Sequence, residues 1–383
     1  MHHQGRTNVN QSSTADDERR RFNRNLSDPL AYATTELTGA GLDRLIYPEL
    51  ESALSEMNGN APMLPRMARY HLGMVDSSGT SVDAEARIIG QGKRMRPLLA
   101  VLSCMAAGGN AEAAAPIAAA IELLHNFSLV HDDIQDRSPN RRHRATVWRV
   151  WGDAQAINVG DALFAASHLA VLNTRPDIVA PEIILKLTAE FNRMTIAIVR
   201  GQVLDLEFEG RSDVQPDDYL GMITGKTAAI VEYAAWAGSH VGGASREDAS
   251  QYAKVGLALG IGFQIRDDLL GIWGAREETG KEVADDIRRR KQSLPILRLR
   301  SQASSGDSQL LDGLYAREEI DEGGVAEVLR LLDKYGIQQQ VVGEVRTAHQ
   351  RANDALAGVA FGADNQGITG ITSLIARMQD RLS

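Results

Sequence analysis

Apolar residues recur along most of the chain at the three-to-four-residue spacing of a helix face, and strand-like alternation is confined to short runs. Residues 301–324 are polar and are predicted to form a loop, while residues 325–381 predict two or three further amphipathic helices. The pattern predicts an all-α protein of about ten or more helices. Its longest predicted helices cover residues 84–107, 111–132, 148–173, 181–205, 216–238 and 245–273.

The predicted helix over residues 245–273 carries two informative local patterns. Ser245 precedes Asp248 by three residues, which is the capping-box arrangement expected at a helix start. Gly256 and Gly260 lie one turn apart on one face, where each costs about 1 kcal/mol relative to Ala. We expect a neighbouring helix to approach this face closely, with a local kink as the alternative.

Length and composition indicate one domain without an internal repeat. Of the 383 residues, 43% are hydrophobic, which is enough for a sizeable core. We therefore predict a single large helical bundle with a central active-site cavity over residues 41–383. Residues 1–40 are rich in Asn, Ser, Thr, Asp and Arg and are predicted to be a mostly disordered polar leader.

Charge and cysteine usage limit the function classes. The formal net charge of −9 provides no basic field for nucleic acid. The single cysteine, Cys104, excludes an internal disulfide and fits a reducing, cytoplasmic compartment. It lies in an apolar run, where a buried thiol is expected more often than a nucleophile. No uninterrupted apolar stretch of about 18 residues and no apolar signal region occur, so we expect neither a transmembrane helix nor secretion.

The first candidate site is the acidic cluster that follows the apolar segment 121–130. Asp132 and Asp136 are four residues apart, so their carboxylates share one helix face and repel each other unless a cation bridges them. Oxygen ligands of this kind suit Mg²⁺. The alternative is a solvated acidic helix end, which the helix dipole disfavours at a C-terminus.

The second candidate site is Gln264, Asp267 and Asp268, which fall within one turn of an apolar helix. Paired aspartates among apolar neighbours require cations or hydrogen-bond donors. The two acidic sites, on helices facing a common cavity, could hold Mg²⁺ ions around a diphosphate.

Basic residues accompany both acidic sites. Each alone is most often a solvated surface charge, but together they suggest a diphosphate site with Mg²⁺ on one flank and cations on the other. The set comprises Lys93, Arg94, Arg96, Arg141, Arg142, Lys226, Lys281 and Lys291.

With these motifs in family order, residues 60–300 resemble the trans-isoprenyl diphosphate synthase family. The pieces that carry the resemblance are Gly92–Pro97, His125, Asp132–Asp136, Arg141–Arg142, Gly160–Leu163, Gly201–Gln202 with Asp205, Lys226–Thr227, Gln264 with Asp267–Asp268, Gly280–Lys281 and Lys291.

The resemblance implies a role for each matching residue. Asp132 and Asp136 would bind two Mg²⁺ ions with Asp133 in support, and Asp267 would bind a third near Gln264 and Asp268. The allylic diphosphate would be held by Arg141, Lys226 and Lys281, with Thr227 positioning Lys226 and Lys291 further out. The diphosphate of isopentenyl diphosphate would be held by Lys93, Arg96, His125 and Arg142.

The chain departs from the family pattern in two places. The second motif ends at Gly271, where many members carry a third aspartate. The loop after Arg142 reads His143-Arg144-Ala145-Thr146, where the family usually has Gly-x-Pro-Thr, so the placement of Arg142 depends on a different loop.

Product length is suggested by the residues before the first motif. Phe127 lies five residues upstream of Asp132, a helical rise of about 7.5 Å, and Ser128 lies next to it. A single aromatic residue beside a small one resembles the family pattern for a C20 product, geranylgeranyl diphosphate. Phe127 could equally be a core residue, and a farnesyl or longer product is the alternative.

Three other functions share some of these features. A class I terpene cyclase would not need Lys93, Arg96 and Arg142. A non-catalytic synthase subunit would not need the complete charged set. An HD-type phosphohydrolase, suggested by His125 and His131-Asp132, leaves Asp136 unexplained. The family resemblance also implies a homodimer.

Overall fold

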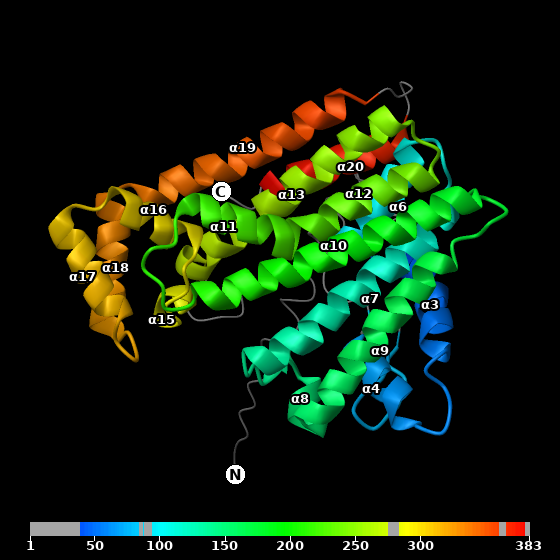
Figure 1. The fold of residues 1–383 in the computed structure, drawn as a ribbon, viewed down its shortest axis with the longest axis horizontal. Coiled ribbons are helices and arrows are strands. Elements are labelled where there is room, and N and C mark those ends of the chain that lie inside the picture. Colours follow the sequence, from blue (N-terminus) through cyan, green and yellow to red (C-terminus); the bar gives the residue numbers. More distant parts are fainter. Residues whose placement is uncertain (1–38, 84–86, 88–93, 275–282, 360–364, 380–383) are drawn as a thin grey trace, which may run out of the picture.

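The computed structural model describes residues 39–83, 87, 94–274, 283–359 and 365–379, and within them it is helical almost throughout (Figure 1). The predicted all-α class is confirmed. The first described helix begins at Ala40, and the predicted leader lies almost entirely outside the described residues. Within the described residues, the named strands are limited to one antiparallel hairpin, β1 (Asn140–Arg141) and β2 (Arg144–Ala145).

The described helices range in length from 4 to 28 residues. In chain order they are α3 (Ala40–Ser55), α4 (Met63–His71), α6 (Met95–Ala106), α7 (Ala111–Gln135), α8 (Val147–Trp151), α9 (Asp153–Leu172), α10 (Pro181–Phe208), α11 (Pro216–Ile223), the π-helix η2 (Thr224–Ala228), α12 (Ala229–Val241), α13 (Arg246–Trp273), α15 (Asp285–Arg288), α16 (Leu294–Gln302), α17 (Ser305–Tyr315), α18 (Glu322–Lys334), α19 (Ile337–Ala357) and α20 (Gln366–Gln379).

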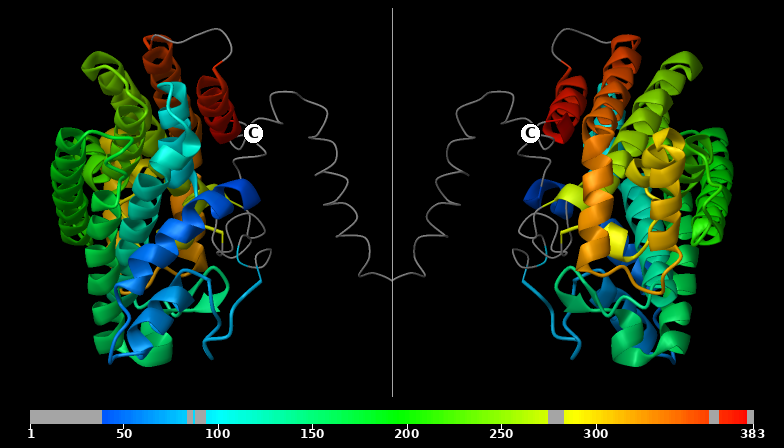
Figure 2. Two further views of the ribbon diagram at one scale, coloured as in Figure 1. Left: turned by 90° about the vertical axis from the view of Figure 1, so that its right-hand side faces the viewer. Right: turned by 90° about the vertical axis from the view of Figure 1, so that its left-hand side faces the viewer.

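The long helices α10, α12, α13 and α19 run alongside one another, and α7 crosses beneath them between α9 and α6 (Figure 1). The C-terminal helix α20 packs on α6, so residues far apart in sequence form one face (Figure 2). Most buried apolar side chains of α3 to α12 form one cluster. A second cluster joins α11, the end of α13 and α15 to α19.

The glycines of α13 have the role expected from their spacing. A Cβ on Gly256 would lie 2.3 Å from the carbonyl oxygen of Val231, and one on Gly260 would lie 2.5 Å from Cα of Ala228. The two helices therefore approach so closely that only glycine fits. Ser245 caps α13 by accepting a hydrogen bond from the Asp248 backbone N–H, as predicted.

Several sequence expectations about helix boundaries were wrong. Residues 305–315 form α17, capped by Ser304, where we expected a loop. The segment 148–173 is two helices, because Gly152 at φ 85° breaks the turn between α8 and α9. The helix predicted over residues 84–107 is broken at Arg94, whose φ is 43°, and α6 begins at Met95; residues 84–86 and 88–93 lie outside the described residues.

Helix α7 is long and apolar enough, by length and composition alone, to cross a membrane. In the fold, 78% of its most apolar window is buried inside the protein. This is the environment of a central core helix, and it explains why α7 is almost uniformly apolar until it reaches the acidic cluster.

Candidate active site

The first acidic cluster lies at the C-terminal end of α7, which continues through the motif to Gln135. Asp132 is partly buried and Asp136, the C-cap residue, is exposed. Burial raises the pKa of Asp132, the neighbouring Asp136 raises it further, and Lys226 opposes both. Because the helix terminus and the like charge both disfavour a carboxylate here, the pair is suited to a bound cation.

Asp133 differs from its neighbours in pointing into the protein, with only 2% of its surface exposed. Its Oδ1 accepts hydrogen bonds from Nε and Nη2 of Arg141, both at 2.8 Å. Burial raises the pKa of Asp133 to about 6, although Arg141 opposes the shift. Asp133 therefore anchors the neighbouring hairpin to α7.

The hairpin β1–β2 carries Arg141 and Arg142. Its two turn residues, Arg142 and His143, have φ values of 50° and 62°, the positive angles of a tight two-residue turn. Non-glycine residues there cost about 1–2 kcal/mol each. Arg144 helps to offset this strain, because its guanidinium lies 4.2 Å from the Tyr70 ring centre and donates to the Val75 carbonyl at 2.8 Å. These two contacts of Arg144 hold the hairpin loop against α4 and the segment that follows it.

Lys226 lies in the π-helical turn η2, which interrupts what the sequence predicted as one helix. Its ammonium is 2.5 Å from Oδ2 of Asp205 on α10. The turn packs closely against α10, since a Cβ on Gly201 would lie 2.2 Å from the backbone nitrogen of Lys226. The extra residue of a π turn redirects side chains, and here Lys226 lies near enough to Asp132 to lower its pKa.

The two aspartates of the second motif have different environments. Asp267 is exposed to solvent, yet the surrounding protein removes enough water to raise its pKa, as does the neighbouring Asp268. Asp268 is fully buried, and its carboxylate accepts hydrogen bonds from Tyr219 at 2.5 Å, Lys291 at 2.9 Å and the Leu294 backbone at 3.1 Å. Asp267 is available for a ligand, whereas both Asp268 oxygens are occupied.

Gln264 links the second motif to the π turn. Its Nε2 lies 3.3 Å from Oδ1 of Asp268, and its Oε1 accepts a 2.8 Å hydrogen bond from Thr227. Burial lowers the pKa of Lys291, but Asp268 and Asp286 outweigh it and the net shift is upward. Lys291, Asp268, Gln264 and Thr227 thus form one chain of contacts that ends beside Lys226.

A second cationic group lies between α6 and α7. Nη1 of Arg96 is 3.3 Å from Nε2 of His125. Burial lowers the pKa of His125 well below its usual range, and Arg96 and Arg142 lower it further, so the imidazole is neutral. Burial lowers the pKa of Arg96, and the carboxylates of Glu122 and Asp267 oppose this shift. The Arg96 guanidinium also lies 5.8 Å from the ring centre of Phe263, so Arg96 lies between α7 and the second motif of α13.

Two predicted site residues, Lys93 and Lys281, lie outside the described residues. Arg94 lies behind the site, where Nη1 is 2.9 Å from Asp43 and Nε is 3.7 Å from Glu122. The sequence provided no signal for Tyr219, for Asp43, or for His71, a half-buried histidine beside the hairpin arginines.

The described residues contain no group of three or more His, Cys, Asp or Glu side chains close enough to hold a metal ion by themselves. Mg²⁺ commonly takes one or two carboxylates and completes its shell with water and phosphate oxygens. The Asp132–Asp136 pair and the accessible Asp267 fit that pattern, since they supply two carboxylates and one carboxylate respectively. Burial and a neighbouring carboxylate raise the pKa of both Asp132 and Asp267, and a bound cation would relieve that repulsion.

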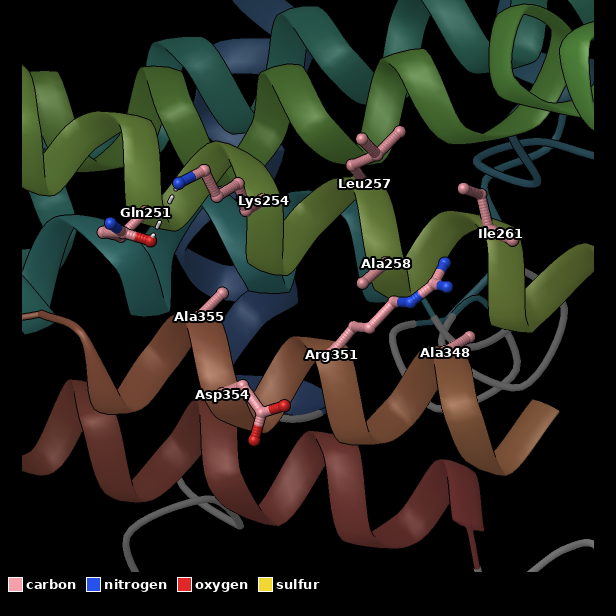
Figure 3. Close-up of a pocket in the computed structure, with 9 residues that line it drawn as sticks. All are labelled: Gln251, Lys254, Leu257, Ala258, Ile261, Ala348, Arg351, Asp354 and Ala355. Carbon is pink, nitrogen blue, oxygen red and sulfur yellow. Dashed lines mark hydrogen bonds between the residues drawn. The ribbon is translucent and has the colours of Figure 1, made fainter. Parts of the chain in front are cut away.

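A separate groove of about 440 Å³ lies between α13 and α19 (Figure 3). Its floor is apolar, formed by residues such as Ala258 and Ile261, and Lys254 and Arg351 lie at its edges. None of the predicted site residues lines it. The groove is on the side of α13 away from the acidic cluster of α7.

Comparison with known proteins agrees with this geometry. The sequence model of the polyprenyl synthetase family matches residues 83–332. The chain belongs to the polyprenyl synthetase family. It is 36% identical over 343 residues to the (2E,6E)-farnesyl diphosphate synthase of Mycobacterium tuberculosis, covering 88% of this chain and 90% of that one. It is 33% identical over 335 residues to the geranylgeranyl diphosphate synthase of the same organism, covering 87% and 91%.

Among solved structures, the polyprenyl synthetase of Streptomyces coelicolor A3(2) matches with a TM-score of 0.78 at 33% identity, covering 89% of this chain and 99% of that one. The protein is therefore a trans-prenyltransferase with the all-α polyprenyl synthetase fold. The related synthases make products of different length, so membership of the family leaves chain length open.

Proposed function

We propose that this polyprenyl synthetase joins isopentenyl diphosphate head to tail to an allylic diphosphate, with magnesium, to give a linear trans-prenyl diphosphate. The observation that carries this proposal is the position of Arg96 between His125 of α7 and Phe263 of α13, which places cationic side chains between the helices that bear the two acidic motifs. A reducing, cytoplasmic location is part of the proposal and is supported by the single free cysteine, Cys104.

The charged residues divide into two diphosphate sites. Asp132, Asp136 and Asp267 would hold the ions, three being the expected number, and Lys226 and Arg141 would bind the allylic diphosphate beside them. Arg96 and Arg142 would bind the diphosphate of isopentenyl diphosphate, with Lys93 and Lys281 completing the two sets.

Several residues predicted to contact substrate are better interpreted as residues that position other site residues. Asp268 and Lys291 hold each other and, through Gln264 and Thr227, fix the turn that carries Lys226. His125 is a neutral neighbour of Arg96, so it can donate to a phosphate oxygen without adding charge.

The reaction follows from charge placement. When bound, magnesium neutralises the charge that develops on the leaving diphosphate. Lys226 and Arg141 stabilise the same charge as the allylic C–O bond breaks. The double bond of isopentenyl diphosphate, held by Arg96 and Arg142, forms the new C–C bond, and a proton leaves the adjacent carbon. The departed diphosphate is the expected acceptor of that proton, and apolar side chains exclude water from the cation.

We infer a C20 product, geranylgeranyl diphosphate, from the residues below Asp132. The Phe127 ring lies 5.2 Å from Phe164 of α9, which lies 4.5 Å from His168. The small Ser128 side chain does not add a second bulky group beside Phe127, and its hydroxyl donates a hydrogen bond to the His125 carbonyl of the same helix. These tilted and edge-to-face ring contacts support the assignment of Phe127 as the floor of the cavity.

Product analysis tests the floor. Phe127→Ala should lengthen the product by about one C5 unit, because Phe164 still lies beneath it, and the double variant with Phe164→Ala should lengthen it further. A product distribution unchanged by both substitutions would refute the assignment.

We also propose a homodimer. Large apolar side chains of α10 are exposed at the spacing of one helix face, namely Ile196, Val199, Val203 and Leu206. Ile196→Asp with Val203→Asp should yield a monomer by light scattering. Gln338→Asp, on the exposed surface of α19, is the control, and a dimer that survives the double change would contradict this interface.

One incubation separates the candidate activities. With Mg²⁺, isopentenyl diphosphate and an allylic diphosphate, a longer linear diphosphate supports the proposal. A hydrocarbon would indicate a cyclase, phosphate release alone a phosphohydrolase, and no product a non-catalytic subunit.

A further inference from the structure

A cavity of about 30 Å³ lies behind the β1–β2 hairpin, between it, α4 and α7. This is large enough for one water molecule. Its walls include the two hairpin arginines and the buried carboxylate that anchors them. The lining residues that matter here are Tyr70, His71, Asp133, Arg141 and Arg142.

Two polar atoms in the lining residues lack a hydrogen-bond partner among the described residues. Asp133 Oδ2 is buried and unpartnered, while Oδ1 receives both bonds from Arg141. His71 Nε2 is also buried and unpartnered. Leaving such groups unsatisfied costs about 1–3 kcal/mol each. One water between them would donate to the carboxylate and bond to the imidazole.

The surroundings of His71 keep its ring neutral and fixed. Burial, together with the charges of Arg142, Arg141 and Arg144, lowers the pKa of His71 to about 3. Asn126 opposes the shift, and its Nδ2 donates to Oε1 of Glu122 at 3.0 Å. A neutral imidazole can lie among three guanidinium groups without repelling them, which a lysine or a charged histidine could not do.

We propose that His71, with one ordered water in this cavity, is a positioning residue that holds the Asp133–Arg141 pair and sets the direction of Arg142. This inference rests on the proposed binding of diphosphates by the two arginines. Arg142 itself has no ion-pair partner within the described residues, so its direction depends on the strained turn and on what packs behind it. His71 lines the cavity behind the hairpin and is the residue we propose limits the positions that Arg142 can take.

The test is a pair of substitutions at His71. His71→Leu removes both nitrogens and should raise KM for isopentenyl diphosphate about tenfold while kcat changes less than threefold, because the reacting groups are untouched. His71→Gln restores a donor and an acceptor at the Nε2 position and should return KM to within threefold of wild type. Calorimetric binding of isopentenyl diphosphate gives the same comparison without turnover.

His240→Leu is the matched control, since His240 is a buried histidine whose pKa is likewise lowered by burial, to about 4, but lies near the distal end of α12. It should leave KM unchanged.

Unaltered KM and affinity in His71→Leu would overturn the inference, as would equal losses in His71→Leu and His71→Gln. A high-resolution crystal structure without a water between His71 and Asp133 would also overturn it. A wild-type protein that binds isopentenyl diphosphate but forms no product would instead refute the proposed function, and the binding comparison would still decide the role of His71.

Discussion

Gly271 stands where many relatives carry a third aspartate, and its surroundings explain the glycine. A Cβ at this position would lie 2.3 Å from Oδ2 and 2.5 Å from Cγ of Asp286, a carboxylate that is 5% exposed. Gly271→Ala therefore adds an overlap of about 1 Å with a buried side chain. Overpacking of this kind costs about 1–3 kcal/mol, less about 1 kcal/mol regained in helix propensity.

Gly271→Asp adds a charge as well. A second carboxylate about 4 Å from Asp286 costs about 4 kcal/mol at an effective dielectric of about 20. We expect the free energy of unfolding to fall by up to about 2 kcal/mol in Gly271→Ala and by about 4–6 kcal/mol in Gly271→Asp, measured by urea denaturation without magnesium. Combining Gly271→Asp with Asp286→Ala should restore most of the loss, because the overlap and the repulsion both disappear.

Gly313→Asp is the control, since a Cβ there meets no atom within 4 Å and the residue is exposed on α17. Its stability should change by less than about 1 kcal/mol. The reasoning is refuted if Gly271→Asp is as stable as wild type, or if the loss persists after Asp286 is removed.

Three further predictions concern the first motif and its partners. The folded pKa of Asp133 is about 6, above its usual 3.8, so the stability it contributes is complete below about pH 4 and is lost as pH rises through 6. Unfolding of the metal-free protein at pH 4.5 and 7.5 should therefore show a decline in stability that is about 2 kcal/mol smaller in Asp133→Asn than in wild type, and equal declines would contradict this. Asp205→Asn should lower kcat about tenfold by releasing Lys226, with the melting temperature nearly unchanged; normal turnover would mean that the 2.5 Å contact does not orient the lysine. Chelation of magnesium by EDTA should abolish product formation, and added Mg²⁺ should restore it; turnover that survives chelation would exclude the proposed role of Asp132.

The sequence by itself determined the helical class, because the apolar spacing, the caps and the breaker residues act locally. It also located the acidic motifs, since carboxylates inside apolar helices demand an explanation wherever the helices lie. The packing role of Gly256 and Gly260 followed from spacing alone. Local signals were weaker for α17, whose polar composition hid a capped amphipathic helix.

Only the tertiary structure decided which of two adjacent aspartates is accessible. Asp267 and Asp268 are neighbours in sequence, but Asp268 is occupied by Tyr219 and Lys291, which lie 49 and 23 residues away. The same holds for Gly271, whose space is taken by Asp286, and for His71, which meets the hairpin arginines only in the fold. Such contacts depend on helices that approach from distant parts of the chain, and no periodicity within one segment can specify them.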